Sequence, residues 1–306
     1  MNIPQNLLVW LGACALAACG GGGGGSPPIT ANVAINTTNA RAVAATALEA
    51  ATNPYHLLGA TGTLSILANN PTASVFTQTQ ACGNGGSANL GGRLVNLFQP
   101  GAGDLLSATY NNCGILTALG AGLVLNGQIT TTFTTATASR LSFRSTLTNL
   151  TITVPGKLFQ FSGDQLSDWD VTNANLLTYS TSGNALAVRA DTPAVARNSV
   201  WNFYQQTVVV SNGNASYALN TLLQSDNGNV GPGGGTFNLT TTTAIVRNSA
   251  TTSLIAGAIR ITGVSNTSML ATVVGPDTIR IDVDANGDGV FEATLATTSA
   301  ELETFR

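Results

Sequence analysis

Apolar and polar residues alternate with a period of two along most of this chain, and this alternation restricts it to a fold built from β-strands. Residues 129–134 read Ile-Thr-Thr-Thr-Phe-Thr, and residues 279–283 read Ile-Arg-Ile-Asp-Val. Successive side chains of a strand point to opposite faces, so each of these stretches presents one face to a core. Threonine, which favours strands, is abundant.

The alternation changes phase between Phe143 and Leu150, and we therefore expect a β-bulge near Thr148-Asn149. Asn-Gly pairs at 84–85 and 126–127 are typical turn sequences that separate predicted strands. No regularly spaced helices intervene, so neighbouring strands are predicted to be antiparallel. The sequence predicts an all-β fold: a large curved antiparallel sheet or incomplete barrel with one N-terminal helix. A two-sheet sandwich is the alternative.

The helix is predicted at residues 38–52. Alanine, valine and leucine recur there at helical spacing, at positions 40, 43, 44, 47, 48 and 51. Thr38 or Asn39 can cap its first turn, and Asn53-Pro54 ends it. Its apolar stripe should pack on the sheet, and residues 37–306 are expected to form a single β-rich domain.

The N-terminus carries a short apolar stretch that ends in Leu-Ala-Ala-Cys at residues 16–19, followed by glycines at 20–25. The stretch is too short for the roughly 20 residues of a membrane-spanning helix. It resembles the processing site of bacterial lipoproteins, which implies a signal peptide over 1–18, a lipid on Cys19 and a Gly/Pro-rich tether over 19–36. Cys14 is a rival lipidation site, and a soluble secreted protein cut nearby is the alternative.

The residue after Cys19 bears on the membrane in which such a lipoprotein stays. In such lipoproteins inner-membrane retention usually needs Asp at that position, and here it is Gly20. The resemblance therefore implies lipid anchoring in the outer membrane, at its periplasmic face or at the cell surface.

Cys82 and Cys113 are the two cysteines left once Cys14 is removed with the signal and Cys19 carries lipid. An exported location is oxidising, so the two are predicted to form a disulfide. Closing a loop of this length stabilises the fold by roughly 3–4 kcal/mol in the chain-entropy model. Two free buried thiols are the alternative.

The segment 284–292 carries oxygen-bearing residues at alternate positions, between predicted strands at 278–283 and 290–296. The candidate Ca²⁺ ligands are the side chains of Asp284, Asn286, Asp288 and Glu292 and the carbonyl of Val290. The spacing resembles calcium loops of extracellular proteins, although Leu295 stands where an EF-hand has its bidentate Glu. A hairpin with solvated acids is the alternative.

Few residues of the chain point to catalysis or to nucleic acid. Charged residues make up 8% of it and the formal net charge is −3. The sequence therefore lacks the excess of basic residues that a nucleic-acid-binding surface requires. His56 is the only histidine and has no accompanying nucleophile motif. Asp164, Asp168 and Asp170 surround Trp169 in a polar stretch, which we interpret as a loop with one anchored tryptophan rather than a glycosidase pair. The chain is predicted not to be an enzyme.

Four short segments resemble those of uncharacterised proteobacterial outer-membrane lipoproteins. They are Cys82-Gly83-Asn84-Gly85-Gly86, Gly101-Ala102-Gly103-Asp104, Tyr110-Asn111-Asn112-Cys113 and Asn286-Gly287-Asp288-Gly289. The resemblance is concentrated between residues 82 and 127. It implies an exported β-rich body with a loop pinned by the cysteine pair, and it implies no activity.

Two functions are expected from these features. The first is a non-catalytic lipoprotein, anchored to the membrane through its lipid, with a binding or structural role toward an envelope partner and Ca²⁺ as the candidate cofactor. The alternative is a carrier of a lipid or other apolar ligand in the curved sheet. A wide apolar concavity would favour the carrier, and a filled core would exclude it.

Overall fold

The structure is a computed structural model of the 306-residue chain. It describes residues 29–57, 75–94, 101–116, 122–137, 139–173, 176–192, 195–211 and 213–306. The predicted signal peptide, Cys19 and residues 20–28 of the predicted tether lie outside the described residues. The end of the tether is described and packs on the body: Asn32 N donates to Thr236 O at 2.9 Å, and Ile35 is fully buried.

The described residues contribute fourteen strands to one sheet. The first seven are β1 (Val75–Ala81), β2 (Ser87–Arg93), β3 (Leu105–Leu116), β4 (Gly122–Ala136), β5 (Arg140–Val154), β6 (Lys157–Asn173) and β7 (Leu176–Asp191). The other seven are β8 (Ala196–Ser211), β9 (Asn214–Ser225), β10 (Gly235–Asn248), β11 (Leu254–Thr262), β12 (Ser268–Gly275), β13 (Thr278–Asp284) and β14 (Ala293–Thr298).

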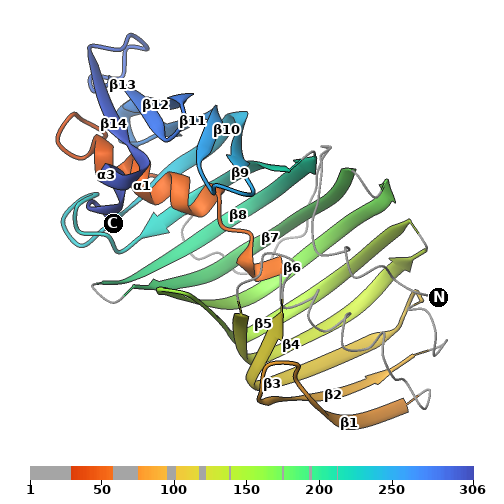
Figure 1. The fold of residues 1–306 in the computed structure, drawn as a ribbon. Coiled ribbons are helices and arrows are strands. Elements are labelled where there is room, and N and C mark those ends of the chain that lie inside the picture. The colour runs from red at the N-terminus through yellow and green to blue at the C-terminus, as the bar shows by residue number, and fades with distance from the viewer. Residues whose placement is uncertain are drawn as a thin grey trace.

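Each strand pairs antiparallel with the next one in chain order, and the sheet is not closed. Figure 1 shows the sheet curving and twisting from β1 at one end to β14 at the other. The prediction of a large curved antiparallel sheet with an N-terminal helix is therefore confirmed. The single meandering sheet differs from the two packed sheets of a sandwich.

The helix α1 (Ala40–Ala51) covers the C-terminal part of the inner face of the sheet (Figure 1). It contacts β9, β10, β11 and β13. Nine of its twelve residues are buried, so it is enclosed on more sides than a single apolar stripe requires. Its alanines leave room for that close approach. The short helix η1 (Tyr55–Leu57) follows, and η2 (Val264–Asn266) lies between β11 and β12.

A second α-helix, α3 (Ser299–Glu303), ends the chain and was not predicted. The side chain of Thr298 caps it by accepting a hydrogen bond from Glu301 N at 3.1 Å. Arg41 of α1 forms a salt bridge with Glu301 at 3.4 Å, and Arg306 bonds Glu49 of α1 at 3.4 Å. These contacts join the N-terminal helix α1 to the C-terminal residues of the chain.

A row of backbone irregularities crosses the sheet, and we call this row the crease. Five strands, β3, β4, β5, β6 and β8, each contribute one residue with a positive φ: Asn112, Gly127, Asn149, Gly163 and Phe203. Strand pairing shifts beside most of these residues. Bulges bend a strand and increase its twist, so aligned bulges curve the whole sheet.

The crease confirms one local prediction and corrects another. The bulge expected near Thr148-Asn149 is present, because the pairing of β5 shifts between Leu147 and Leu150. The turn predicted at Asn126-Gly127 is wrong, because the pair lies inside β4. Glycine is required there: at φ 93° an added Cβ would lie 2.1 Å from Asn149 O of β5. An Asn-Gly pair supplies positive φ equally well to a bulge and to a turn.

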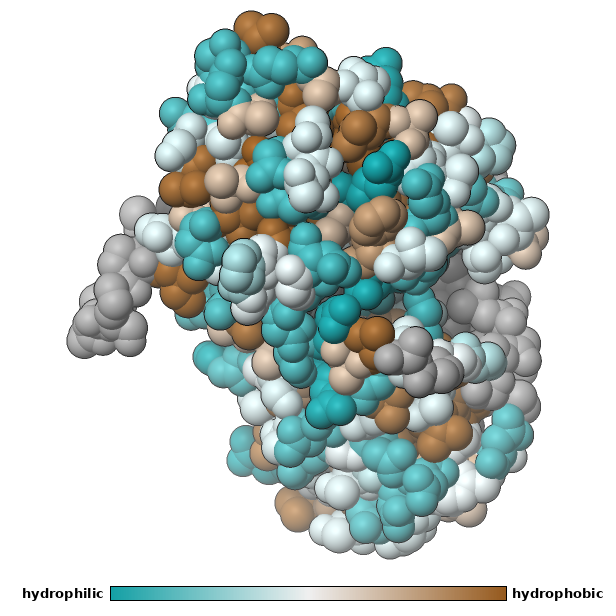
Figure 2. Space-filling view, turned by 90° about the vertical axis from the view of Figure 1, so that its left-hand side faces the viewer, coloured by the Kyte–Doolittle hydropathy of each residue, from teal (hydrophilic) through white to brown (hydrophobic). Residues whose placement is uncertain are grey.

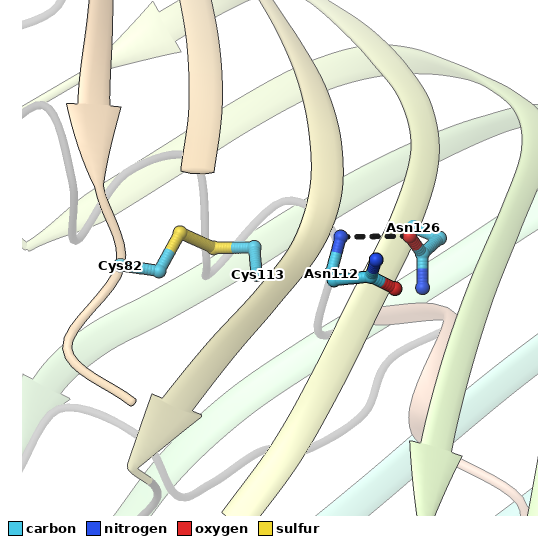
Figure 3. The surroundings of a disulfide bond; sticks show 4 residues. All are labelled: Cys82, Asn112, Cys113 and Asn126. Carbon is cyan, nitrogen blue, oxygen red and sulfur yellow. Dashed lines mark hydrogen bonds between the residues drawn. A yellow bond between two sulfur atoms is a disulfide. The ribbon is translucent and has the colours of Figure 1, made fainter. Parts of the chain in front are cut away.

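The predicted disulfide between Cys82 and Cys113 is confirmed, with a Cα–Cα distance of 5.3 Å (Figure 3). It holds the β1–β2 turn over β3, where Asn84 N donates to Gly114 O at 3.0 Å. The neighbouring residue Asn112 belongs to the crease and donates its backbone N–H to Asn126 Oδ1 at 2.8 Å (Figure 3). The disulfide thus anchors one end of the crease.

Candidate functional site

Three carboxylates come together in the turn between β13 and β14, which we call the acidic loop (residues 284–292). One oxygen each from Asp284, Asp288 and Glu292 lies within 4.8 Å of the other two. Asp284 ends β13 and is 1% exposed, whereas the other two acids are exposed. The loop therefore presents one buried and two accessible carboxylates to the same point.

Backbone N–H groups hold these carboxylates in place. Asp284 accepts hydrogen bonds from Gly287 N at 2.7 Å and Gly289 N at 3.0 Å. Asp288 accepts from the N–H of residue 290 at 2.8 Å, and Glu292 accepts from that of residue 285 at 2.9 Å. Both glycines have a positive φ, which lets the chain turn back onto Asp284. The carboxylates are thus oriented before any ion arrives.

The remaining two predicted ligands are placed differently. Asn286 faces Asp288: its Nδ2 donates to Asp288 Oδ2 at 3.1 Å, and its Oδ1 accepts from Asp288 N at 2.8 Å. Val290 is exposed and lies in the loop, because β14 starts at Ala293 rather than at the predicted residue 290. The structure therefore groups three of the five predicted ligands, all of them carboxylates.

The charge of the acidic loop is not balanced by neighbouring basic side chains. No Lys or Arg among the described residues forms a salt bridge with Asp284, Asp288 or Glu292. Like charges at this distance repel one another. A hard divalent cation with oxygen ligands would remove that repulsion, and Ca²⁺ accepts such a flexible set of carboxylates.

The three acids around Trp169 were predicted to lie in a loop, and this is wrong. They belong to β6, where the even-numbered Asp164 and Asp168 face outward and Trp169 is buried inside. Arg140 hydrogen-bonds Asp168 and lowers its pKa, and Arg144 bonds Asp164 Oδ2 at 3.0 Å. Asp164 and Asp168 thus form ion pairs on the outer face, whereas Asp170 accepts hydrogen bonds from Thr172.

His56 lies in the core, where η1 meets the inner face of the sheet. Its Nε2 is 3.3 Å from Thr181 Oγ1, and its ring makes an edge contact with Trp201 at 5.6 Å. Burial lowers the pKa of His56 to about 3, so the ring is neutral at physiological pH. His56 is therefore a fully buried core residue.

Buried polar side chains cross five strands on the same inner face, and we call them the polar belt. They are Thr131 of β4, Ser145 of β5, Gln165 and Ser167 of β6, Thr181 of β7 and Gln206 of β8. Cross-strand pairing makes them neighbours, since Ser145 is opposite Gln165 and Thr181 is opposite both Ser167 and Gln206. The belt runs alongside the crease.

Aromatic rings flank the polar belt on two sides. On one side Phe143 and Trp169 meet edge to face at 4.8 Å, and Trp169 meets Tyr179 in the same way at 4.8 Å. On the other side Tyr204 and Trp201 lie around His56. The belt is therefore a polar strip between two aromatic walls.

Many polar atoms of this region have no hydrogen-bond partner in the part of the chain that the structure describes. Eight such buried atoms are His56 Nδ1, Gln165 Nε2 and Oε1, Ser167 Oγ, Trp169 Nε1, Trp201 Nε1, Tyr204 OH and Gln206 Oε1. An unpaired buried polar group costs about 1–3 kcal/mol. Even at the low end the sum is about 8 kcal/mol, which is comparable to the net stability of a whole domain.

A groove of about 430 Å³ lies beside α1, where the start of β6 approaches α3. Its lining includes Leu48, Tyr55, Phe159 and Leu302, together with Arg247. Arg247 Nη2 is 3.4 Å from Thr52 Oγ1, and no described carboxylate lies within 4.0 Å of its guanidinium. The groove thus combines apolar side chains with a guanidinium that forms no salt bridge, and its lining also includes the acids Glu49, Asp277 and Glu303.

The chain matches no protein-family model, no curated protein and no solved structure. None of the helices in the described ranges is long and apolar enough to cross a membrane.

Proposed function

We propose that this protein is a non-catalytic lipoprotein of the outer membrane, anchored through Cys19, whose β-sheet body has a binding or structural role and is stiffened by Ca²⁺ at the acidic loop. The observation that carries the proposal is the grouping of Asp284, Asp288 and Glu292 within 4.8 Å. Backbone N–H groups already orient these carboxylates. An ion bound by them would therefore fix the turn.

The arrangement of the titratable groups supports a non-catalytic role. Asp164 and Asp168 are engaged by Arg144 and Arg140 on the outer face. His56 is enclosed in the core on the opposite face. An acid and a base that work together must both reach one reacting group, and these residues are separated by the sheet.

Calcium binding is tested by thermal unfolding of the full chain with excess Ca²⁺ and with a chelator. At 100 times Kd a ligand adds about 2.7 kcal/mol, which for a domain of this size raises Tm by about 5 °C or more. Mg²⁺ is the control ion, since its demand for regular octahedral geometry suits this open loop poorly. An unchanged Tm in Ca²⁺ would contradict the stiffening role.

The anchor is tested separately by labelling cells with a palmitate analogue. The wild-type protein and a Cys14→Ser variant should incorporate the label and fractionate with the outer membrane. Cys19→Ser should lose both the label and the membrane association. Label retained in Cys19→Ser but lost in Cys14→Ser would move the anchor to the rival cysteine.

The groove beside α1 favours a second candidate function, the carrier of an amphipathic ligand. Its apolar residues suit an acyl chain, and Arg247 suits an acidic head group. Titration with dodecanoate should give saturable binding, and Arg247→Gln should weaken it at least tenfold. Arg260→Gln is the matched control, because Arg260 also lacks a salt bridge among the described residues and does not line the groove. Equal binding by both variants would exclude this role for the groove.

A further inference from the structure

The polar belt requires hydrogen-bonding partners that the described chain does not supply. Gln165, Ser167 and Trp169 occupy alternate positions of β6, and all three have unpaired polar atoms in the described part of the fold. By contrast, Thr131 and Ser145 bond each other at 2.9 Å, and Gln206 Nε2 donates to Ala51 O at 3.3 Å. The polar atoms without a partner are therefore concentrated in the middle of the belt.

The unpaired atoms define the chemistry of a partner. Trp169 and Trp201 offer only N–H donors, Gln206 Oε1 is only an acceptor, and Gln165 has one of each. None of the belt residues carries a formal charge, and His56 beside it is neutral. A charged ligand would enter without a counter-ion, which is costly in a buried site. An uncharged molecule with both donors and acceptors matches the set.

The geometry of Tyr204 shows that this arrangement is closely built. Tyr204 lies over Gly183 of β7: a Cβ added at Gly183 would be 2.7 Å from one carbon of the ring and 3.1 Å from another. Only a glycine at 183 leaves room for the ring in this position. The same added Cβ would lie 2.5 Å from Asp164 O of β6, so Gly183 also brings β7 and the ring close to the residue that precedes Gln165.

We propose that the polar belt is a binding site for an uncharged, hydroxyl-rich small molecule, such as a neutral sugar or polyol. Its hydroxyls meet the unpaired atoms of Gln165, Ser167 and Gln206, and its C–H faces pack between the two aromatic walls. Water alone would satisfy the polar atoms but would gain little from the flanking rings. This site is independent of the acidic loop, of the groove beside α1 and of the lipid anchor.

Two measurements on the full chain test the proposal. The protein purified from its own envelope is weighed by native mass spectrometry before and after denaturation. The folded form should carry extra mass from a neutral molecule, and a Gln165→Leu/Gln206→Leu variant should lack it. Stripped protein is then titrated with glucose while tryptophan fluorescence is followed, because Trp169 and Trp201 line the site. The wild-type response should saturate.

The variants distinguish a site from a general effect of sugar on the protein. Gln165→Leu and the milder Ser167→Ala should each weaken the glucose response at least tenfold. Gln205→Leu is the matched control: Gln205 precedes Gln206 on β8, faces outward and should leave the response unchanged. Glucuronate, which keeps the sugar ring of glucose and adds a carboxylate, should bind at least tenfold more weakly. No extra mass and no response to glucose, or equal responses in all variants, would show that water alone fills the belt and would overturn the proposal.

Discussion

The acidic loop and the polar belt are both polar, but their hydrogen-bonding groups are satisfied in opposite ways. In the loop, the buried carboxylate of Asp284 accepts two backbone N–H groups from residues within the next five positions. In the belt, Gln165 is equally buried, yet neither its oxygen nor its nitrogen has a partner among the described residues. The hydrogen bonds of the loop are complete without a ligand, whereas those of the belt are not.

This difference teaches that the two regions respond to a ligand for different reasons. The loop is short of positive charge, so a cation would relieve repulsion without replacing any hydrogen bond. The belt is short of hydrogen-bond partners, so a neutral molecule would satisfy groups that otherwise weaken the core. Removing the buried carboxylate of Asp284 should therefore destabilise the loop, whereas removing the unpaired amide of Gln165 should stabilise the ligand-free belt.

Acidification should give the largest change in the free energy of unfolding. It acts through His56, which lies beside the polar belt. The folded-state pKa of His56 is about 3 and that of an unfolded histidine is about 6.5. Between these values the unfolded chain binds the extra proton, so the free energy of unfolding falls as pH decreases. The loss is about 1.4 kcal/mol per pH unit, or about 3 kcal/mol from pH 6.5 to 4.

Urea unfolding at pH 7 and pH 4 of the wild type and of His56→Gln measures this effect. The variant keeps the acidic groups of the protein, so the difference between the two slopes isolates the histidine. We expect the variant to lose much less stability than the wild type between the two pH values. Identical losses would mean that His56 is accessible to protons in the folded state.

Asp284→Ala should have the next largest effect. It removes the buried acceptor of the N–H groups of Gly287 and Gly289. We expect the free energy of unfolding to fall by about 2–3 kcal/mol, because both donors lose a charged acceptor. Asp284→Asn, which keeps one acceptor oxygen, should lose about half as much. A loss below about 0.5 kcal/mol for Asp284→Ala would show that water replaces the carboxylate.

The acidic loop was predictable because its information is local. Alternating acids with Gly287 and Gly289 between two strand patterns indicate a turn with several oxygens, whatever the rest of the fold. The disulfide followed from counting cysteines, and the bulge at Asn149 followed from a phase change within one strand. The final helix α3 also has a local signal that was overlooked, the capping pair Thr298 and Glu301.

The polar belt was not predictable because it depends on register across five strands. Gln165 and Ser167 stand in a stretch that is polar at nearly every position, so composition suggested a loop rather than β6. Which of these residues meets Thr181 is set by bulges in the neighbouring strands. One residue of slip would move them to the other face of the sheet.

Gln165→Leu should change stability by a smaller amount and in the opposite direction from Asp284→Ala. Gln165 has no partner among the described residues to lose, and leucine fills a similar volume without unpaired polar atoms. We expect the ligand-free protein to gain about 1 kcal/mol in the free energy of unfolding. Denaturant unfolding measures it, with Gln205→Leu as the outward-facing control. A loss of stability specific to Gln165→Leu would show that this side chain is satisfied in the native state.

Asp288→Ala should have the smallest effect when calcium is absent. Asp288 is exposed, and its main contacts, with Asn286 and with the N–H of residue 290, stay within the loop. In chelator we expect its free energy of unfolding to lie within about 0.5 kcal/mol of wild type, because exposed substitutions away from special features cost little. In excess Ca²⁺ the variant should lose the rise in Tm that the wild type shows, since one of three grouped carboxylates is missing. An outer-face substitution, Asp170→Ala, should keep that rise. If Asp288→Ala kept it as well, the acidic loop would be a solvated hairpin, and the contrast with the belt would be one of hydrogen bonding alone.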